Sequence, residues 1–283
     1  MFRSEPHRNR LAAAAVAALS ALASAAFASP ASAWEPPPVN AGFDYQIGGD
    51  YPLPDGVSVV SRDWFSGTAA DDPAYSICYV NAFQTQANEA GTDRPDEQSN
   101  WPRKLILTKL GDDPKWGGEY LVDISTAKKR ERAARWVQQM IQGCADGGFE
   151  AVEFDNLDSW TRFSGTPLDR KVPFGKKEAV AFAELLADRS HALGLAVGQK
   201  NTVELTPSMR AQVSFDFVIA EECGRYRECD RYVKAYGDNV IAVEYSQKAF
   251  RRTCDAIGDR VSVVLRDRFV SRPGARSYKF ADC

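Results

Sequence analysis

The sequence predicts an α/β protein that folds as a single-domain (β/α)8 TIM-type barrel. Short runs of strand-forming residues recur along the chain, and most are apolar with little alternation, as in strands buried on both faces. Helical patterns separate several of these runs, and parallel strands need such crossovers. About eight strand–helix units in roughly 250 residues fit this barrel. A doubly wound open sheet is the alternative, but no phosphate-binding glycine motif follows any of the runs.

Nine strands are expected, one more than the barrel needs, so at least one should be an extra or edge strand. They span residues 44–47, 57–61, 76–81, 120–124, 151–155, 195–200, 215–220, 240–244 and 261–265. Residues 128–145 place apolar side chains on one helical stripe, and residues 176–193 form a second helical pattern that ends at Gly194. The polar segment 84–118 is expected to form a long loop over one mouth of the barrel, where substrate contacts tend to lie.

Residues 1–33 have the pattern of a secretion signal. Arginines at positions 3, 8 and 10 precede an apolar run over residues 11–28, and Ala31-Ser32-Ala33 offers small residues for cleavage before Trp34. A retained membrane anchor is the alternative, but the run is short and dominated by alanine. We therefore expect a secreted protein with a signal peptide (1–33), an extended lead-in (34–42) and a barrel domain (43–283).

The composition is that of a globular protein, with 44% apolar and 26% charged residues in a chain of 283. Loss of residues 1–33 removes three arginines and one glutamate, which changes the net charge from −3 to −5. This mildly acidic balance argues against a nucleic-acid partner and is compatible with a cationic ligand. No later stretch approaches the ~20 apolar residues of a membrane span. We expect a monomer with no membrane partner.

All six cysteines follow residue 33, and in an oxidising compartment they could form up to three disulfides. Cys223 and Cys229 are close enough in sequence to close a small loop and are the preferred pair. Metal binding is the competing interpretation. The chain has no C-x-x-C pair, and His191 is the one histidine left after residue 33, so we expect no metal and no cofactor. His191 lies near the end of its helix, and we interpret it as structural.

Carboxylates end two of the expected strands, and the carboxyl ends of barrel strands carry the chemistry of this fold. Alternation places Glu153 and Asp155 on one face, pointing inward if Phe154 packs outward. Glu221 and Glu222 follow the strand 215–220. Two such groups are what a glycosidase needs, one to protonate the leaving oxygen and one to attack or to activate water. The alternative is that strand-end acids cap the next helix or form buried ion pairs, above all at Asp158 and Glu222.

The sequence resembles the endo-α-1,4-polygalactosaminidases, glycoside hydrolase family 114, from Phe43 to Arg268. The resemblance rests on residues 149–158, on residues 195–201 and on Glu221-Glu222-Cys223 followed by Tyr226, supported by Tyr45-Gln46, Asp63-Trp64 and Cys78-Tyr79 in the same order. It implies a (β/α)8 barrel that cleaves α-1,4-linked galactosamine polymers internally. It further implies Asp155 as nucleophile or electrostatic base and Glu221 as general acid. The residues expected to bind this cationic polysaccharide are Asp63, Tyr79, Asp158, Lys200, Asn201, Glu222 and Tyr226.

Three departures from the family pattern lie at the mouth of the barrel. Phe154 replaces the usual proline, Ala220 replaces the usual asparagine, and Val80-Asn81 replaces a small-residue turn. They leave the acid pair intact and touch the region that sets sugar specificity. A catalytically inactive glycan-binding protein on the same barrel is therefore the alternative function. A polymer deacetylase is disfavoured because the chain lacks the histidines that would hold its metal.

Overall fold

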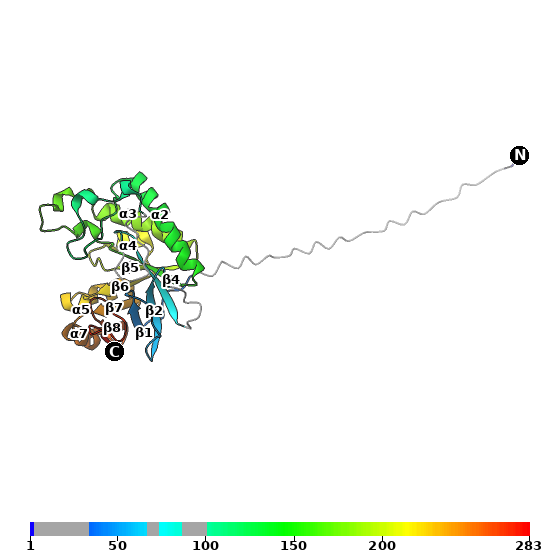
Figure 1. Cartoon of the computed structure of the whole chain (residues 1–283). Coiled ribbons are helices and arrows are strands. Elements are labelled where there is room, and N and C mark those ends of the chain that lie inside the picture. The colour runs from blue at the N-terminus through cyan, green and yellow to red at the C-terminus, as the bar shows by residue number, and fades with distance from the viewer. Residues whose placement is uncertain (3–33, 67–73, 87–100) are drawn as a thin grey trace. The chain divides into compact units, whose positions relative to one another are not determined.

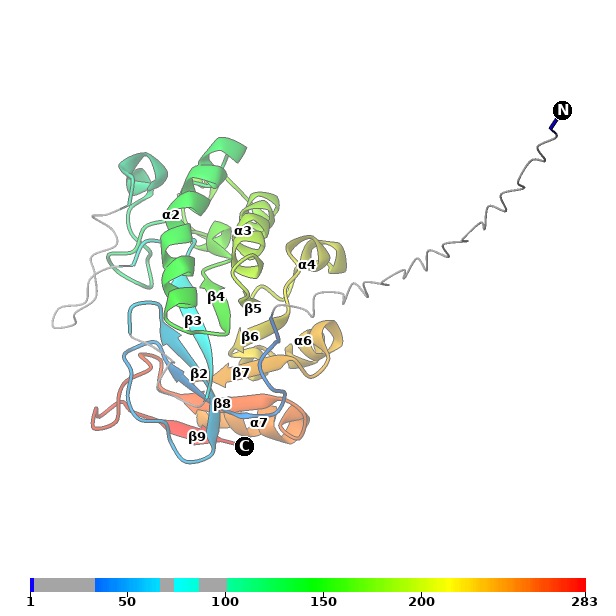
Figure 2. The same ribbon diagram turned by 90° about the vertical axis from the view of Figure 1, so that its right-hand side faces the viewer.

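Eight parallel strands follow one another in chain order through the described residues, which are 1–2, 34–66, 74–86 and 101–283 of the computed structural model. Each pairs with the next, and β8 also lies beside β1, so the sheet curls into a nearly closed barrel (Figures 1 and 2). A ninth strand pairs antiparallel with β8. The strands are β1 Gly42–Gln46, β2 Val57–Asp63, β3 Tyr75–Asn81, β4 Ala151–Asp155, β5 Ala196–Lys200, β6 Phe217–Glu221, β7 Val240–Glu244, β8 Ser262–Arg266 and β9 Phe280–Asp282. The TIM-type barrel expected from the sequence is confirmed.

Helices cover the barrel from β3 onward. They are α2 Ala127–Asp146, α3 Lys176–His191, α4 Pro207–Val213, α5 Cys223–Tyr226, α6 Cys229–Tyr236 and α7 Gln247–Ile257, with the 3-10 turns η2 Arg103–Leu105, η3 Thr108–Leu110, η4 Ser159–Thr161 and η5 Asp169–Lys171. The two helices expected near 128–145 and 176–193 are confirmed to within two residues. Helix α2 begins where the Thr126 hydroxyl accepts from Lys129 N–H. None of the described helices is long and apolar enough to cross a membrane.

Residues 120–124 do not form the barrel strand that their composition predicts. Leu121 and Val122 make only isolated antiparallel bridges, to Gln84 and Ile106. The apolar residues of the segment are buried outside the barrel, and β3 pairs directly with β4. This segment was therefore the surplus strand. The short strand β9 was not expected from the sequence.

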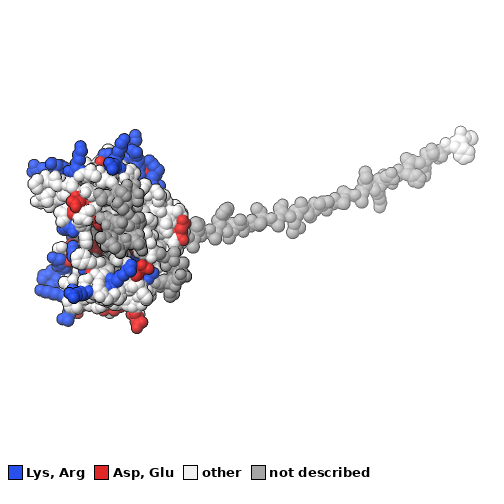
Figure 3. All heavy atoms as spheres, viewed as in Figure 1, with Lys and Arg blue, Asp and Glu red and all other residues white. Residues whose placement is uncertain are grey.

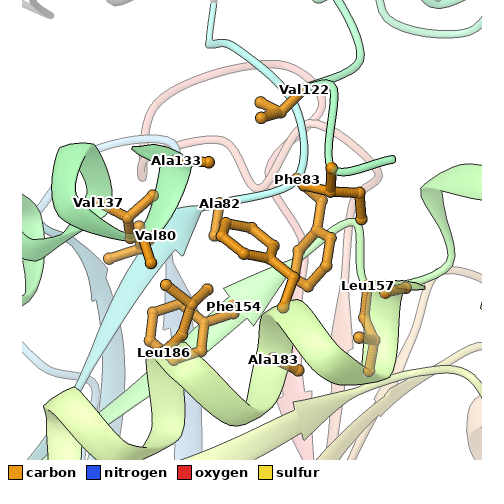
Figure 4. Close-up of a cluster of buried hydrophobic side chains, with 14 of the residues drawn as sticks. Val80, Ala82, Phe83, Val122, Ala133, Val137, Phe154, Leu157, Ala183 and Leu186 are labelled. Carbon is orange, nitrogen blue, oxygen red and sulfur yellow. The ribbon is translucent and has the colours of Figure 1, made fainter. Parts of the chain in front are cut away.

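The core has an inner and an outer layer. Inside the barrel, alternate strand residues such as Phe43, Phe217 and Ile241 fill the space between the strands. The largest outer cluster lies between β3, β4 and the helices α2 and α3 (Figure 4). Phe154 points into this outer cluster with Leu186 of α3. Its two neighbours in β4 therefore point into the barrel, as the alternation predicted.

Three disulfides are present: Cys78–Cys144, Cys223–Cys229 and Cys254–Cys283. They join β3 to α2, α5 to α6, and α7 to the C-terminal residue. The preferred pairing of Cys223 with Cys229 is confirmed. All six cysteines of the chain are thereby paired.

By its own contacts the chain divides into the units Met1–Ala31 and Ser32–Cys283, and the fold above is that of the second unit. The expected signal peptide lies outside the described residues except for Met1 and Phe2, and its cleavage site lies at their boundary, before Trp34. Of the expected loop 84–118, the structure describes residues 84–86 and 101–118. The lead-in contains no helix or strand between Trp34 and Ala41, and β1 begins at Gly42, one residue before the expected barrel boundary.

Candidate active site

A cavity of about 260 Å³ opens at the carboxyl ends of the barrel strands. The strands β3 to β8 contribute to its wall near or just beyond their last residues, and Ile47 and Gly48 after β1 also line it; this is the usual place for the active site of this fold. The contributors from these ends are Tyr79 of β3, Asp155 of β4, Lys200 of β5, Glu221 of β6, Tyr245 after β7 and Arg268 after β8.

Lys200 lies at the base of this cavity, with 1% of its side chain exposed. Its Nζ donates a hydrogen bond to the Tyr45 hydroxyl over 2.7 Å. It also lies 3.2 Å from Asp155 Oδ1, 3.4 Å from Glu153 Oε2 and 3.8 Å from Glu221 Oε2. Burial by itself lowers the pKa of Lys200, but the three carboxylates outweigh it and raise the pKa well above the usual value. The ammonium is therefore a permanent cation shared by three acids.

Asp155 is held as an ionised carboxylate. Its Oδ2 accepts a hydrogen bond from the Tyr79 hydroxyl over 2.7 Å, and its Oδ1 accepts from Asn156 N–H over 2.8 Å. Burial alone would raise the pKa of Asp155, but the Lys200 ammonium and these two hydrogen bonds outweigh it, so the pKa lies below its usual value. The group can act as a nucleophile or stabilise positive charge at neutral pH.

Glu153, two residues before Asp155, has a different position. It is fully buried, does not line the cavity, and accepts hydrogen bonds from the Ser61 and Tyr45 hydroxyls. Burial raises the pKa of Glu153 although Lys200 and Ser61 act against it. Glu153 therefore belongs to the floor that holds Lys200 in place.

Glu221 lies on the other side of Lys200 from β4. Asn201 Nδ2 donates to Glu221 Oε2 over 2.9 Å, and the Tyr245 hydroxyl donates to Oε1. About a quarter of the Glu221 side chain is exposed, at 24%, so it can contact a ligand in the cavity. The contacts of 3.2 Å and 3.8 Å with Lys200 limit the separation of Asp155 Oδ1 and Glu221 Oε2 to about 7 Å.

The backbone turns sharply after each of the strands β4, β5 and β6. Asn156, Asn201 and Glu222 have φ values of 62°, 47° and 58°, in the left-handed region. Asparagine tolerates this conformation, whereas glutamate does so at some cost in free energy. Non-glycine residues in this conformation concentrate at functional sites. Here each turn directly follows a strand-end residue that lines the cavity.

The structure brings most of the predicted site residues together. Asp158 and Glu222 line the cavity and are ion-paired, Asp158 with Arg162 and Glu222 with two arginines. Asp63 and Tyr226 do not line it. Asp63 is buried at the end of β2 and accepts a hydrogen bond from Gln86, while Tyr226 is 61% exposed and contacts Arg225.

Several cavity residues were not predicted from the sequence. Tyr245 directly follows the strand 240–244 and could have been found by the same strand-end rule. Glu119 and Trp116 come from the loop before α2, and Phe269 comes from the segment after β8. Trp116 and Phe269 are 37% and 71% exposed, and exposed aromatic rings at a cavity rim suit the apolar faces of sugars.

The described residues offer no thiolate or histidine cluster for a metal. Cys223, Cys229 and Glu244 are the one group of His, Cys, Asp and Glu within ligand distance of one another in the described part of the chain. The two cysteines form a disulfide, so they cannot act as thiolates. On the face drawn in Figure 3, Lys and Arg are prominent along the upper edge and at the lower left, and Asp and Glu are scattered between them and at the bottom.

A carboxylate pair on either side of a buried ammonium, in a cavity rimmed by aromatic rings, is suited to acid–base chemistry on a sugar.

Two solved structures that share the fold are compared with this chain. The chain is 20% identical to Ega3 of Aspergillus fumigatus, solved in complex with galactosamine, with 88% of this chain and 97% of that chain covered and a TM-score of 0.69. It is 11% identical to the glycoside hydrolase domain of PelA from Pseudomonas aeruginosa, with 84% and 99% covered and a TM-score of 0.55. No curated protein sequence matches the chain. The model of glycoside-hydrolase family GH114 matches residues 23–279, nearly the whole chain, and the protein therefore belongs to this family of glycosidases.

Proposed function

We propose that this glycosidase is a secreted enzyme that cleaves α-1,4-linked, galactosamine-containing polysaccharide internally, with Asp155 and Glu221 as its catalytic residues. The observation that carries the proposal is the shared ammonium of Lys200, which lies between these two carboxylates at the base of one cavity. The galactosamine complex of the similar Ega3 structure supports the choice of sugar.

In the proposed reaction Asp155 attacks C1 of the sugar. Glu221 enters the cycle with a proton taken up from solvent, and it gives this proton to the glycosidic oxygen as the bond from C1 to that oxygen breaks, so the leaving chain departs as an alcohol. Water then attacks C1 of the glycosyl–Asp155 ester, Glu221 takes one water proton, and the sugar is released with a new hydroxyl. Lys200 stabilises Asp155 as a carboxylate before and after each cycle. Tyr245 and Asn201 orient Glu221.

Export to an oxidising compartment is part of the proposal, with residues 1–33 as signal peptide, 34–42 as lead-in and 43–283 as the hydrolase domain. The three disulfides support it, because such bonds persist mainly outside the reducing cytoplasm. The monomer is proposed as the active form.

The test is to incubate the mature chain with α-1,4-linked galactosamine polymers, with and without N-acetyl groups, and to size the products by mass spectrometry. Short oligosaccharides that are absent with Glu221→Gln and with Asp155→Asn are the expected result. Release of single sugars only would overturn internal cleavage. Intact polymer that still binds would favour a glycan-binding protein without turnover.

A further inference from the structure

Glu119 is a cavity carboxylate with no role in the proposed reaction. It lies in the loop that joins η3 to α2, and its side chain is half-buried in the cavity wall. Its Oε2 accepts one hydrogen bond, from Asn81 Nδ2 over 3.1 Å. Asn81 ends β3 and is the sheet partner of Asp155, so Glu119 lies on the Asp155 side of the cavity.

Glu119 differs from the other acids of the cavity in its partners. Five carboxylates line the cavity among the described residues, and four of them lie within ion-pair distance of a basic side chain. Within those same residues Glu119 has no such partner, because the nearby guanidinium of Arg162 contacts other groups. The four paired acids are Asp155 and Glu221 with Lys200, Asp158 with Arg162, and Glu222 with Arg225 and Arg268.

The surroundings of Glu119 favour a cation. Burial and the neighbouring charges of Asp155 and Asp113 raise the pKa of Glu119 to about 8, against the opposing effects of Asn81 and Arg162. A cationic group beside it would remove the repulsion from Asp155 and supply the missing counter-ion. Without a cation beside it, the Glu119 carboxyl therefore keeps its proton near neutral pH, and a substrate cation would allow it to ionise.

We propose that Glu119 binds the ammonium group at C2 of the sugar whose C1 is attacked by Asp155, and thereby selects the free amine over the N-acetyl form. This inference rests on the proposed function. C2 is bonded to C1, so a substituent on C2 lies next to the group that faces Asp155. An N-acetyl group carries no charge, so it would form no ion pair and the Glu119 carboxyl would stay protonated beside it.

Proton release accompanies this binding. Near neutral pH the Glu119 carboxyl holds its proton, and pairing with the substrate ammonium requires that proton to leave for solvent. The affinity for the amino sugar therefore rises with pH towards about 8, as long as the sugar amine keeps its own proton. The groups that face Glu119 are Asp155 and Tyr79 from the strands, Asp113 from its own loop, and Arg162.

The test compares Glu119→Gln with Asp112→Asn. The first variant keeps a side-chain oxygen that can accept from Asn81 and loses only the ability to become an anion. The second removes a carboxylate from the same loop but outside the cavity, and its amide oxygen can still accept from Gly118 N–H. Steady-state kinetics on α-1,4-linked galactosamine oligomers and on their N-acetylated counterparts give a selectivity ratio for each protein.

We expect Glu119→Gln to lower kcat/KM on the free amine at least about tenfold, mainly through KM, and to change the N-acetylated substrate less than about twofold. Asp112→Asn should keep the wild-type ratio. An unchanged ratio in Glu119→Gln would overturn the inference while the proposed function stands. Equal losses on both substrates would also overturn it, and their recovery on an aryl glycoside with a good leaving group would assign Glu119 to proton donation instead.

Calorimetry with galactosamine separates this inference from a failure of the proposed function. Titrations in buffers of different ionisation enthalpy count the protons released on binding. Proton release in the wild type that disappears in Glu119→Gln supports the amine site even if no polymer is cleaved. No binding of galactosamine by the wild type would overturn the amine site, and the polymer cleavage assay would then decide the proposed function by itself.

Discussion

Asn201 and Glu221 exchange two hydrogen bonds across neighbouring strands. Asn201 Nδ2 donates to Glu221 Oε2 over 2.9 Å, and Glu221 N–H donates to Asn201 Oδ1 over 2.7 Å. The same amide therefore fixes both the backbone and the side chain of the proposed general acid. The left-handed backbone of Asn201, with φ of 47°, is what turns its side chain towards β6.

Replacing Asn201 with alanine should lower kcat about a hundredfold, because a misplaced general acid loses most of its contribution. The substitution also leaves Glu221 N–H without its acceptor, which should lower the free energy of unfolding by about 1–3 kcal/mol. Both effects are checked by kinetics on the galactosamine polymer and by chemical denaturation. A variant with the wild-type kcat would show that Glu221 does not depend on this amide.

The Lys200 ammonium and the hydrogen bond from Tyr79 both lower the pKa of Asp155 and so extend activity towards acid pH. The folded protein lowers the pKa of Asp155 below its usual value of about 3.9. The ionised carboxylate therefore contributes its full stability above about pH 3.9, and this contribution is lost as the pH falls through the lower pKa of the folded state. We expect Tyr79→Phe to raise the pKa of Asp155 and to move the acid limb of kcat/KM to higher pH. Coincident acid limbs in the two proteins would contradict this assignment.

Lys200 compensates three buried or half-buried carboxylates, so its loss should be severe. In Lys200→Met the acids Glu153, Asp155 and Glu221 lack their cation, and the free energy of unfolding should fall by about 3–5 kcal/mol near neutral pH. The loss should be smaller in mild acid, where the carboxylates take up protons. Thermal melts between about pH 4 and 8 check this. An equal loss at every pH would argue that Lys200 acts by packing alone.

Much of the site could be predicted because strand alternation and strand ends depend on local sequence. Phe154 is apolar and flanked by acids, and this pattern alone orients Glu153 and Asp155 inward. The same rule would have found Tyr245, which follows an apolar run. The rule over-predicted at residues 120–124, where apolar side chains are buried between loops and α2 rather than in the sheet.

Glu119 could not be predicted from local sequence. It follows Gly118 in an irregular loop, and two contacts position it. Its carbonyl accepts from Asp113 N–H of the same loop over 2.7 Å, and its carboxylate accepts from the distant Asn81 of β3. Neither contact has a periodic signal in the chain. The unpaired state of its charge appears only when the basic groups around the cavity are compared in space.

The disulfide Cys223–Cys229 begins two residues after Glu221, whereas Cys254–Cys283 lies away from the cavity lining. The pairs close loops with sequence separations of 6 and 29, so loss of the second should cost more stability. We expect the double serine variant at 223 and 229 to lose about 2 kcal/mol of unfolding free energy and most of its activity. The matched variant at 254 and 283 should retain kcat on the polymer despite its larger loss of stability. Equal activities in the two variants would contradict a role for the first disulfide in holding Glu221.

The stereochemical outcome follows from the separation of the two catalytic carboxylates. Retaining glycosidases hold them about 5–5.5 Å apart, whereas inverting enzymes need about 6.5–9.5 Å to admit a water molecule between carboxylate and sugar. In this structure the contacts of 3.2 Å and 3.8 Å with one ammonium keep the nearest oxygens of Asp155 and Glu221 within about 7 Å, which is compatible with the short separation that a retaining enzyme needs. We therefore expect retention, with the new reducing end released first as the α-anomer.

Proton NMR during the first minutes of polymer cleavage records this anomer before mutarotation mixes the two forms. Initial appearance of the β-anomer would instead make Asp155 the base that activates water, and a trapped glycosyl ester on Asp155 should then be absent from mass spectra of the denatured enzyme.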